Sequence, residues 1–493
     1  MRIAFIGNQG GRDVIALYAD MARTLIDEFG AEVRFALWLD REKAMPAECG
    51  APEAEVESFE EYVRALPVPN AAAVEKLIRR YRDVCWSEVV AAERAFTDYS
   101  MLLGAAGERR EGPEYVQRLV VAIVGYLEHE LVGCAAVVCQ TADTLFSLAV
   151  FKVASHLGVP AYAIAPAWLL EPEKGGGFLA NNEYLECRRM VRSFERRQGT
   201  ALLDDERSRT DALVHSIRGF SGKTAFHATT SKGKSAGRNA LTPNWRRLLE
   251  YLVENSRRDK YVEYIKIDPA RKIQANLLRA FRKLSARHTY GTLDVAGIPE
   301  RSVFYALHYQ PEQSTLAQGI WHVNQVALVE NLSKSLPLGY TLVVKEHPWG
   351  RGNRPRWQYD HMAGFHNVIF CDAPAKEIIQ RVDAVVAVSG TVAMEALVFD
   401  KPTVILGRNF FEFSDLFYRV RDIQDLPDTL ARILIDGDYS RQTDREERLH
   451  RFLMAYLDGL IPCFPLPGQM AEWGRALVEE MRLDPLPNRG STK

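Results

Sequence analysis

The chain has 493 residues, of which 47% are hydrophobic and 26% charged, so it is neither a disordered nor a fibrous protein. At roughly 100–200 residues per domain, this length predicts more than one domain. Lys and Arg number 62 against 64 Asp and Glu, giving a net charge of −2. That balance excludes a chain that binds nucleic acid through overall positive charge, and we expect no nucleic acid partner.

The charge is unevenly distributed along the chain. Residues 188–287 hold 24 Lys and Arg against 10 Asp and Glu, a net charge of +14, which leaves −16 for the remainder. Such a segment suits an anionic partner, and its alternative role is a solvated helical face.

Cysteine usage and hydropathy indicate the compartment. The seven Cys are scattered without a C-x-x-C pair, which predicts thiols of a reducing compartment and no disulfide framework. The longest apolar run, Leu119–Leu127, stops at Glu128 and is shorter than the roughly 20 residues of a membrane span. We expect a cytoplasmic protein, at most peripheral to the inner membrane.

Apolar runs that alternate with helical spacing predict a parallel sheet early in the chain. Its strands are expected at Ile3–Ile6, Val33–Leu39, Ala135–Cys139 and Ala161–Ala165. Helical spacing over Asp13–Phe29 and Phe59–Leu131 supplies the helices. We assign residues 1–295 to a Rossmann-like N-terminal domain, with a basic helical insertion at about residues 181–290.

The same alternation returns in residues 296–428 and predicts a second Rossmann-like domain. Its strands are expected at Val303–Leu307, Thr341–Val344, Val368–Cys371, Ala384–Val388 and Thr403–Leu406. Helices over 429–484 and a frayed tail over 485–493 follow. The predicted fold is α/β, with two doubly wound domains facing a cleft in which the carboxyl ends of the strands line a ligand site.

The strongest candidate residues follow the strand that ends in Val343-Val344. Pro348 stops this strand and holds Lys345, Glu346 and His347 at its carboxyl end. An imidazole beside a Lys suits a phosphate. The alternative is a His that caps the strand by bonding to nearby backbone.

A small hydroxyl-bearing turn, Ser389-Gly390-Thr391, follows the strand Ala384–Val388 and opens a helix that carries Glu395. Backbone N–H groups and the positive end of the helix dipole favour a phosphate or diphosphate at such a turn. Glu395, one turn further on, suits ribose hydroxyls. Alternatively, the turn is an ordinary N-cap and Glu395 is a solvated helix residue.

Polar residues also follow two other strands of this domain. His308, Gln310 and Glu312 come after the first strand, and a buried His or Gln must find partners, which favours site lining over core. Arg408 follows the last strand and is placed to reach an anionic ligand.

The first domain offers candidate groups for an acceptor. Gly10 and Gly11, in the first strand-helix loop, give room for a sugar near the sheet edge. Asp13 opens the next helix and Asp143 follows Ala135–Cys139, so either is a candidate general base, with helix capping as the alternative for both. We expect no metal or other cofactor, because the one D-x-D motif lies in a turn between helices.

The runs Phe304–Glu312, Val344–Pro348 and Val388–Leu397, with Lys401-Pro402, resemble bacterial capsule and surface polysaccharide biosynthesis proteins. These are glycosyltransferases of the two-Rossmann GT-B fold and include the β-Kdo transferases. The similarity covers about residues 300–410. It implies a nucleotide-sugar donor, with His347 and the Ser389–Thr391 turn on its phosphate and Glu395 near the ribose.

The resemblance further implies an inverting, metal-independent transfer, with CMP-sugars, in particular CMP-Kdo, favoured over UDP-sugars. The acceptor is then an anionic or lipid-linked glycan at the inner membrane. Two related enzymes use similar turns, a CDP-glycerol-type phosphotransferase and a UDP-sugar 2-epimerase. A non-catalytic subunit of a polysaccharide assembly or export complex is the third alternative.

Overall fold

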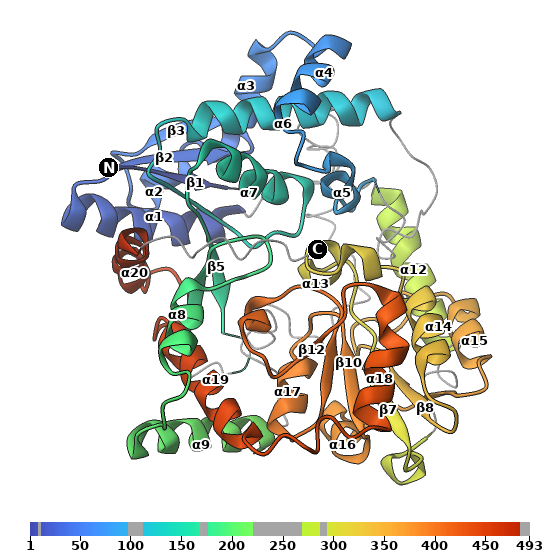
Figure 1. The fold of residues 1–493 in the computed structure, drawn as a ribbon. Helices are drawn as coiled ribbons and strands as arrows, with labels where there is room; N and C mark the ends of the chain where they lie inside the picture. Colours follow the sequence, from blue (N-terminus) through green and yellow to red (C-terminus); the bar gives the residue numbers. More distant parts are fainter. Residues whose placement is uncertain are drawn as a thin grey trace.

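A computed structural model describes residues 1–7, 11–96, 112–167, 169, 176–219, 269–285 and 293–483. Gly10, the expected tail over residues 485–493 and residues 220–268 of the expected insertion lie outside these ranges. Each of the two α/β domains is built around a six-stranded sheet. Figure 1 shows the first domain in its upper half and the second domain in its lower half. The predicted α/β class with two Rossmann-like domains is confirmed.

The first sheet has the order β3-β2-β1-β4-β5-β6, parallel except for β6, which runs antiparallel to β5. Helix α1 covers one face, and α6 and α7 cover the other. Because both faces are covered, β1 and β4 are almost wholly apolar and buried. The strands are β1 (Arg2–Ile6), β2 (Glu32–Leu37), β3 (Glu55–Ser58), β4 (Ala136–Cys139), β5 (Ala161–Pro166) and β6 (Gly177–Ala180).

The helices of this domain divide the long helical stretch expected before residue 131. Pro67–Pro69 and the residues around Tyr81 separate its shorter members, and a Pro at the first position starts the last one. They are α1 (Gly11–Phe29), α2 (Met45–Glu48), α3 (Phe59–Ala65), α4 (Ala71–Arg80), α5 (Trp86–Ala91), α6 (Pro113–Leu131) and α7 (Leu145–Leu157).

The second sheet has the order β12-β11-β10-β7-β8-β9, with every neighbouring pair parallel. Its strands are β7 (Ser302–Ala306), β8 (Thr341–Lys345), β9 (Val368–Phe370), β10 (Ala384–Ala387), β11 (Thr403–Ile405) and β12 (Tyr418–Arg419). Its helices are α13 (Gln313–Leu316), α14 (Gln325–Ser335), α15 (Arg356–Ala363), α16 (Ala375–Arg381), α17 (Val392–Val398) and α18 (Leu426–Leu434). The chain reverses its winding direction between β7 and β10, and in such sheets the ligand crevice lies at this point.

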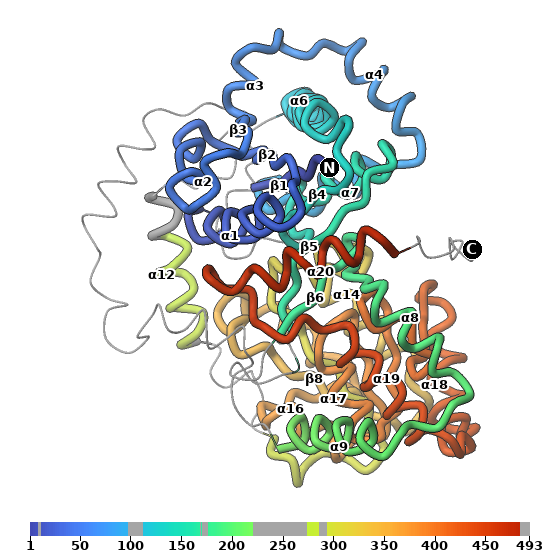
Figure 2. The backbone as a smooth tube through the Cα atoms, turned by 90° about the vertical axis from the view of Figure 1, so that its left-hand side faces the viewer, coloured from blue at the N-terminus to red at the C-terminus, as the bar shows by residue number. Residues whose placement is uncertain are grey.

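The remaining helices connect the two domains. They are α8 (Arg188–Arg196), α9 (Asp204–Gly219), α12 (Pro269–Ser285), α19 (Arg445–Gly459) and α20 (Ala471–Arg482). Helix α20 returns to the first domain and packs on α1, as the red and blue segments of Figure 2 show. Among the described helices, none combines the length and apolar character needed to cross a bilayer.

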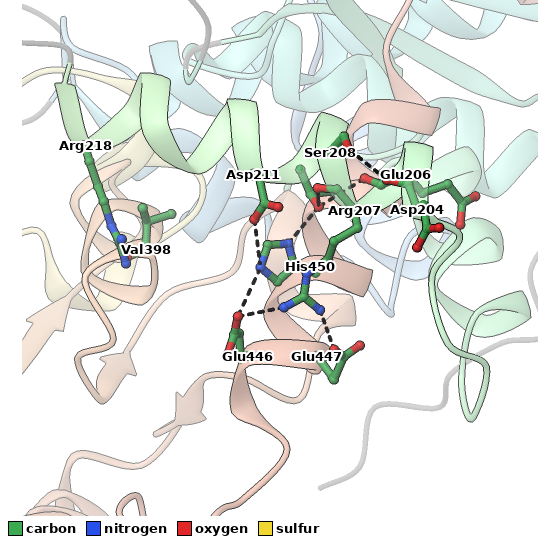
Figure 3. A network of polar contacts seen from close by, with 11 residues as sticks. Asp204, Glu206, Arg207, Ser208, Asp211, Arg218, Val398, Glu446, Glu447 and His450 are labelled. Atoms are coloured by element: carbon green, nitrogen blue, oxygen red, sulfur yellow. Dashed lines mark hydrogen bonds and ion pairs between the residues drawn. The ribbon is translucent and has the colours of Figure 1, made fainter.

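A buried histidine ties α19 to α9 (Figure 3). The Nδ1 atom of His450 lies 2.7 Å from the hydroxyl of Thr210. Around it, Arg207 forms ion pairs with Glu446 and Glu447 on α19. This network joins the basic insertion to the C-terminal helices.

Candidate functional site

Three loops of the second domain meet at the carboxyl ends of β7, β8 and β10. They carry His308, His347 and Gly390, in that order along the chain. A Cβ atom added at Gly390 would lie 3.1 Å from Cε1 of His308. His347 lies close enough to His308 to lower the pKa of its ring, and the rings of His347 and Tyr309 are 5.7 Å apart. The structure thus brings together the predicted residues His308, His347 and Gly390.

The main chain of His308 is fixed on both sides. Its N–H donates to Oε1 of Gln325 (2.5 Å), and its carbonyl accepts from Nε2 of Gln325 (3.1 Å) and from Arg354 (2.9 Å). Burial, together with the nearby His347 and Arg354, lowers the pKa of the His308 imidazole to about 4. The ring is therefore neutral at pH 7 and acts as a hydrogen-bonding group.

His347 begins a tight turn after β8. Its Nδ1 accepts a hydrogen bond from the main-chain N–H of Trp349 (3.2 Å), which favours the tautomer with the hydrogen on Nε2. This contact matches the alternative of a His that bonds to nearby backbone, and phosphate binding by the ring stays a prediction. Tyr309 and Trp349 stand beside the ring.

Glu346 has a different place from the one predicted. Its side chain is 0% exposed and its carboxylate accepts from Arg354 (2.9 Å), the Tyr359 hydroxyl (2.6 Å) and the N–H of His347 (2.8 Å). A carboxylate enclosed in this way does not reach a ligand. We therefore correct its assignment from donor contact to support of the His347 turn.

In the turn after β10, the hydroxyl of Ser389 is engaged by the protein. The Ser389 hydroxyl donates to the carbonyl of Ser314 (2.9 Å), and the Ser389 carbonyl accepts from Asn409. Thr391, at the N-cap of α17, makes no side-chain capping bond. Since Ser389 is buried and its proton is engaged, Gly390 and Thr391 are the residues of this turn that are available to a ligand.

Three other predicted donor residues are engaged by protein groups. Gln310 is buried and donates to the carbonyl of Val323 (2.7 Å). Lys345 turns to Asp372, with its Nζ 3.5 Å from the carboxylate, and burial lowers the pKa of its amine. Arg408 stacks 3.9 Å above the ring of Tyr184 in the first domain and contacts Glu412. Pro348 is exposed beside the turn.

An arginine from the first domain links the two halves of the site. Arg94 forms an ion pair with Asp143 (2.6 Å) and also lowers the pKa of Glu312 in the second domain. Burial nevertheless raises the pKa of Glu312 to about 7 and raises that of Asp143. The loops that follow β4 and β7 therefore face one another across the domain junction.

The other predicted residues lie at the margins of this cluster or apart from it. Asp13 is exposed in the first turn of α1, which Gly11 opens with a φ of +63°. Glu395 is partly buried, which raises the pKa of its carboxyl group, and Lys376 lowers it. No contact places Asp13 against the His308 cluster within the described residues.

Sequence reasoning missed four supporting residues: Arg94, Gln325, Arg354 and Tyr359. Arg354 lies later in the loop that follows β8, and the other three lie outside the loops that carry the predicted motifs. Their contacts form only in the fold. In the described part of the chain, no group of three or more His, Cys, Asp or Glu could hold a metal ion.

Residues 322–421 match the family described as "Capsule polysaccharide biosynthesis protein". This region is similar to that family over about a fifth of the chain. It contains the His347 turn and the Ser389–Thr391 turn, so the predicted resemblance is confirmed for the runs Val344–Pro348 and Val388–Leu397, whereas the run Phe304–Glu312 precedes the matched residues. A stretch of 104 residues is 27% identical to the "Capsule polysaccharide export protein KpsS" of Escherichia coli. The match covers 20% of this chain and only 26% of that relative of the capsule family.

Solved structures with a similar course of the chain include two enzymes. One is Thermosulfurimonas dismutans KpsC, a beta Kdo 2,4 transferase, at 12% identity over 66% of this chain and 80% of that chain, with a TM-score of 0.33. The other is UDP-GlcNAc 2-epimerase from Methanocaldococcus jannaschii, at 12% identity over 92% and 99% of the two chains, with a TM-score of 0.23. These values are too low to assign an activity to this chain.

Proposed function

We propose that this chain is a glycosyltransferase that moves a sugar from a nucleotide donor to a capsular or other surface glycan. The observation that carries the proposal is the convergence of His308, His347 and Gly390 at the winding reversal of the second sheet. Two of these three loops lie in the region that matches the capsule family.

The donor phosphate is proposed to lie between the His347 ring and the backbone of Gly390 and Thr391. As the glycosidic bond breaks, its electron pair moves to the phosphate oxygen of the departing nucleotide. Fixed donors at that oxygen stabilise the transition state more than the ground state, which accelerates the reaction. Neutral His308 supplies a further hydrogen bond, and Glu395 is proposed to accept from the ribose.

The acceptor oxygen is proposed to attack the anomeric carbon from the side of the first domain. Its proton passes to a carboxylate, and one displacement of this kind inverts the anomeric centre. Asp143 is the better placed candidate base because it lies at the carboxyl end of β4 and, through Arg94, beside Glu312. Asp13 remains the alternative. This reaction requires no metal in our proposal.

We further propose a CMP-sugar, CMP-Kdo in particular, as donor in preference to UDP-sugars, and an anionic or lipid-linked glycan as acceptor at the cytoplasmic face of the inner membrane. These finer assignments rest on the motif resemblance in residues 300–410. The positive charge of residues 188–287 suits such an acceptor.

A donor panel tests the proposal. Purified protein is incubated with CMP-Kdo, UDP-sugars, GDP-sugars and CDP-glycerol, with and without EDTA, and products are identified by mass spectrometry. Glycan extension with release of free CMP, unaffected by EDTA, is expected. Transfer of glycerophosphate or isomerisation of the donor would replace the proposal by one of the related enzymes. The absence of any nucleotide-induced thermal shift would favour a non-catalytic subunit.

A further inference from the structure

Helix α12 leaves an apolar side uncovered. Leu277, Phe281 and Leu284 are 67%, 68% and 67% exposed. Their spacing of four and three residues places them on one side of the helix, which we call the α12 apolar face. Three large exposed apolar side chains in line indicate a surface that contacts something other than water.

The opposite side of α12 is held against the site loop. Arg279 donates to the carbonyl of Trp349 (2.9 Å), and Arg282 donates to that of Asn353 (2.9 Å). The helix approaches so closely that a Cβ at Gly352 would lie 2.6 Å from the carbonyl oxygen of Arg279. The α12 apolar face therefore points away from the turn that begins at His347. Figure 2 shows α12 on the outer side of the molecule, level with the junction of the domains.

The charge of α12 indicates which kind of partner the α12 apolar face binds. Its 17 residues include Arg271, Lys272, Arg279, Arg282 and Lys283 and contain no Asp or Glu. Lys283 is itself exposed beside the α12 apolar face. Arg279 and Arg282 are bonded to the site loop, so among the described side chains Lys283 is the cation beside this face. An apolar stripe flanked by a cation, on a helix without acidic residues, suits the interface of an anionic membrane, where the stripe enters the acyl boundary and the cation stays among the headgroups.

We propose that α12 docks this protein on an anionic phospholipid surface through Leu277, Phe281 and Leu284. Trp349, two residues after His347 and 38% exposed, accepts a hydrogen bond from α12 through its carbonyl, so the helix and the His347 turn are joined. Docking would thus hold the candidate site next to the membrane. This last step rests on the proposed function and deepens it, because it gives a lipid-linked acceptor a short route to the site.

Vesicle binding of the full chain tests the proposal. Sedimentation is compared for vesicles of phosphatidylcholine alone and for vesicles that also contain phosphatidylglycerol, at low and high salt. We expect preferential binding to the anionic vesicles that weakens with salt. The variant Leu277→Ser/Phe281→Ser/Leu284→Ser should lose about tenfold or more of this binding, and Lys283→Glu should also lose about tenfold.

A matched variant controls for loss of exposed apolar surface in general. Leu203, Leu338 and Ile435 are 66%, 94% and 61% exposed elsewhere, so Leu203→Ser/Leu338→Ser/Ile435→Ser should bind vesicles like the wild type. Equal binding to neutral and anionic vesicles, or wild-type binding by the α12 variant, would overturn the proposal. If the wild type is a dimer and only the α12 variant is a monomer, the α12 apolar face binds a second copy of this chain instead.

The same samples separate this proposal from the proposed function. Thermal shifts with nucleotides should be unchanged in the α12 variant, because no substituted residue belongs to the donor cluster. If vesicle binding fails while glycan extension persists, only the membrane contact is wrong. If extension fails while vesicle binding persists, only the glycosyltransferase assignment is wrong.

Discussion

At the scale of single residues, His347 has the most direct role in the proposed chemistry. His347→Ala should lower donor turnover by at least about 100-fold, because one fixed donor to a developing oxyanion contributes this much to the rate. Stability should fall by only about 1 kcal/mol, the usual net contribution of a hydrogen bond such as the one that Nδ1 accepts from the N–H of Trp349. Steady-state kinetics and urea unfolding measure both effects. His366→Ala, at an exposed histidine outside the cluster, is the control. Full turnover in His347→Ala would contradict the assignment.

The two candidate bases are distinguished by the same kind of substitution. Asp143→Asn keeps the size of the side chain but cannot accept the acceptor proton, so turnover should fall by about 100-fold or more while nucleotide binding persists. Asp13→Asn should be close to wild type, because Asp13 is exposed and away from the His308 cluster. Turnover and nucleotide thermal shifts are measured for each. If Asp13→Asn alone is inactive, the base is Asp13, and if both are active, neither carboxylate is the base.

At the scale of elements, the turn after β8 depends on a buried ion pair. Arg354 and Glu346 have side chains only 4% and 0% exposed, and Arg354 also holds the carbonyl of His308. Arg354→Met leaves Glu346 buried without its cation, which should cost about 3–5 kcal/mol of unfolding free energy. Urea unfolding measures the loss. The exposed pair of Arg356 and Asp360 provides the control, and Arg356→Met should cost less than about 1 kcal/mol. Similar losses in the two variants would contradict this view.

The junction of α9 and α19 should make stability depend on pH. Burial and Arg207 lower the pKa of His450, although Asp211, Glu446 and Glu447 raise it. The folded state therefore binds fewer protons at this ring than the unfolded state does. This contribution to stability is complete above the unfolded pKa of about 6.5 and is lost as the pH falls below it. Urea unfolding at pH 7.5 and 5.5 should show a smaller loss for His450→Gln than for the wild type. An equal loss in both proteins would exclude His450 as the cause.

Strands and helices can be predicted from the sequence where burial imposes a regular pattern of apolar residues. Parallel strands covered on both faces are continuous apolar runs, and four strands of the first sheet and five of the second lie where such runs were found. β3 was missed because its sequence, Glu-Val-Glu-Ser, contains acidic residues at alternate positions and is not an apolar run. It lies at the edge of the sheet, where it forms an ion pair with Arg34. β6 was missed because it is short and antiparallel.

The candidate site, like the strands, could be predicted only in part from the sequence. Strand ends at His308, His347 and Gly390 were predicted because parallel topology places such loops at one edge of a sheet. The engagement of Glu346 and the Ser389 hydroxyl by protein groups was not, because Arg354, Tyr359 and Ser314 reach them only through tertiary packing. A sequence pattern locates a loop but does not say which of its polar groups face inward.

At the scale of the whole molecule, the end of the described chain completes the first domain. Trp473 of α20 is 0% exposed, and Asp20 of α1 accepts from the N–H groups of Gly468 (2.8 Å) and Met470 (2.9 Å). Two helices from opposite ends of the chain thus share one core. In the sequence, the second domain therefore lies between two segments, α1 and α20, that both contribute to the core of the first domain.

Trp473→Ala tests this arrangement. The substitution removes a large buried side chain and should destabilise the first domain by about 3–5 kcal/mol. Hydrogen exchange should rise in α1 and β1 and change little in β7 and β8, because Trp473 packs with the first sheet only. Trp321→Ala is the control, since Trp321 is 82% exposed and its loss should leave exchange unchanged in both domains. Faster exchange in β7 and β8 as well would mean that the two domains unfold as one unit, whereas unchanged exchange in α1 would show that α20 is dispensable for the first domain.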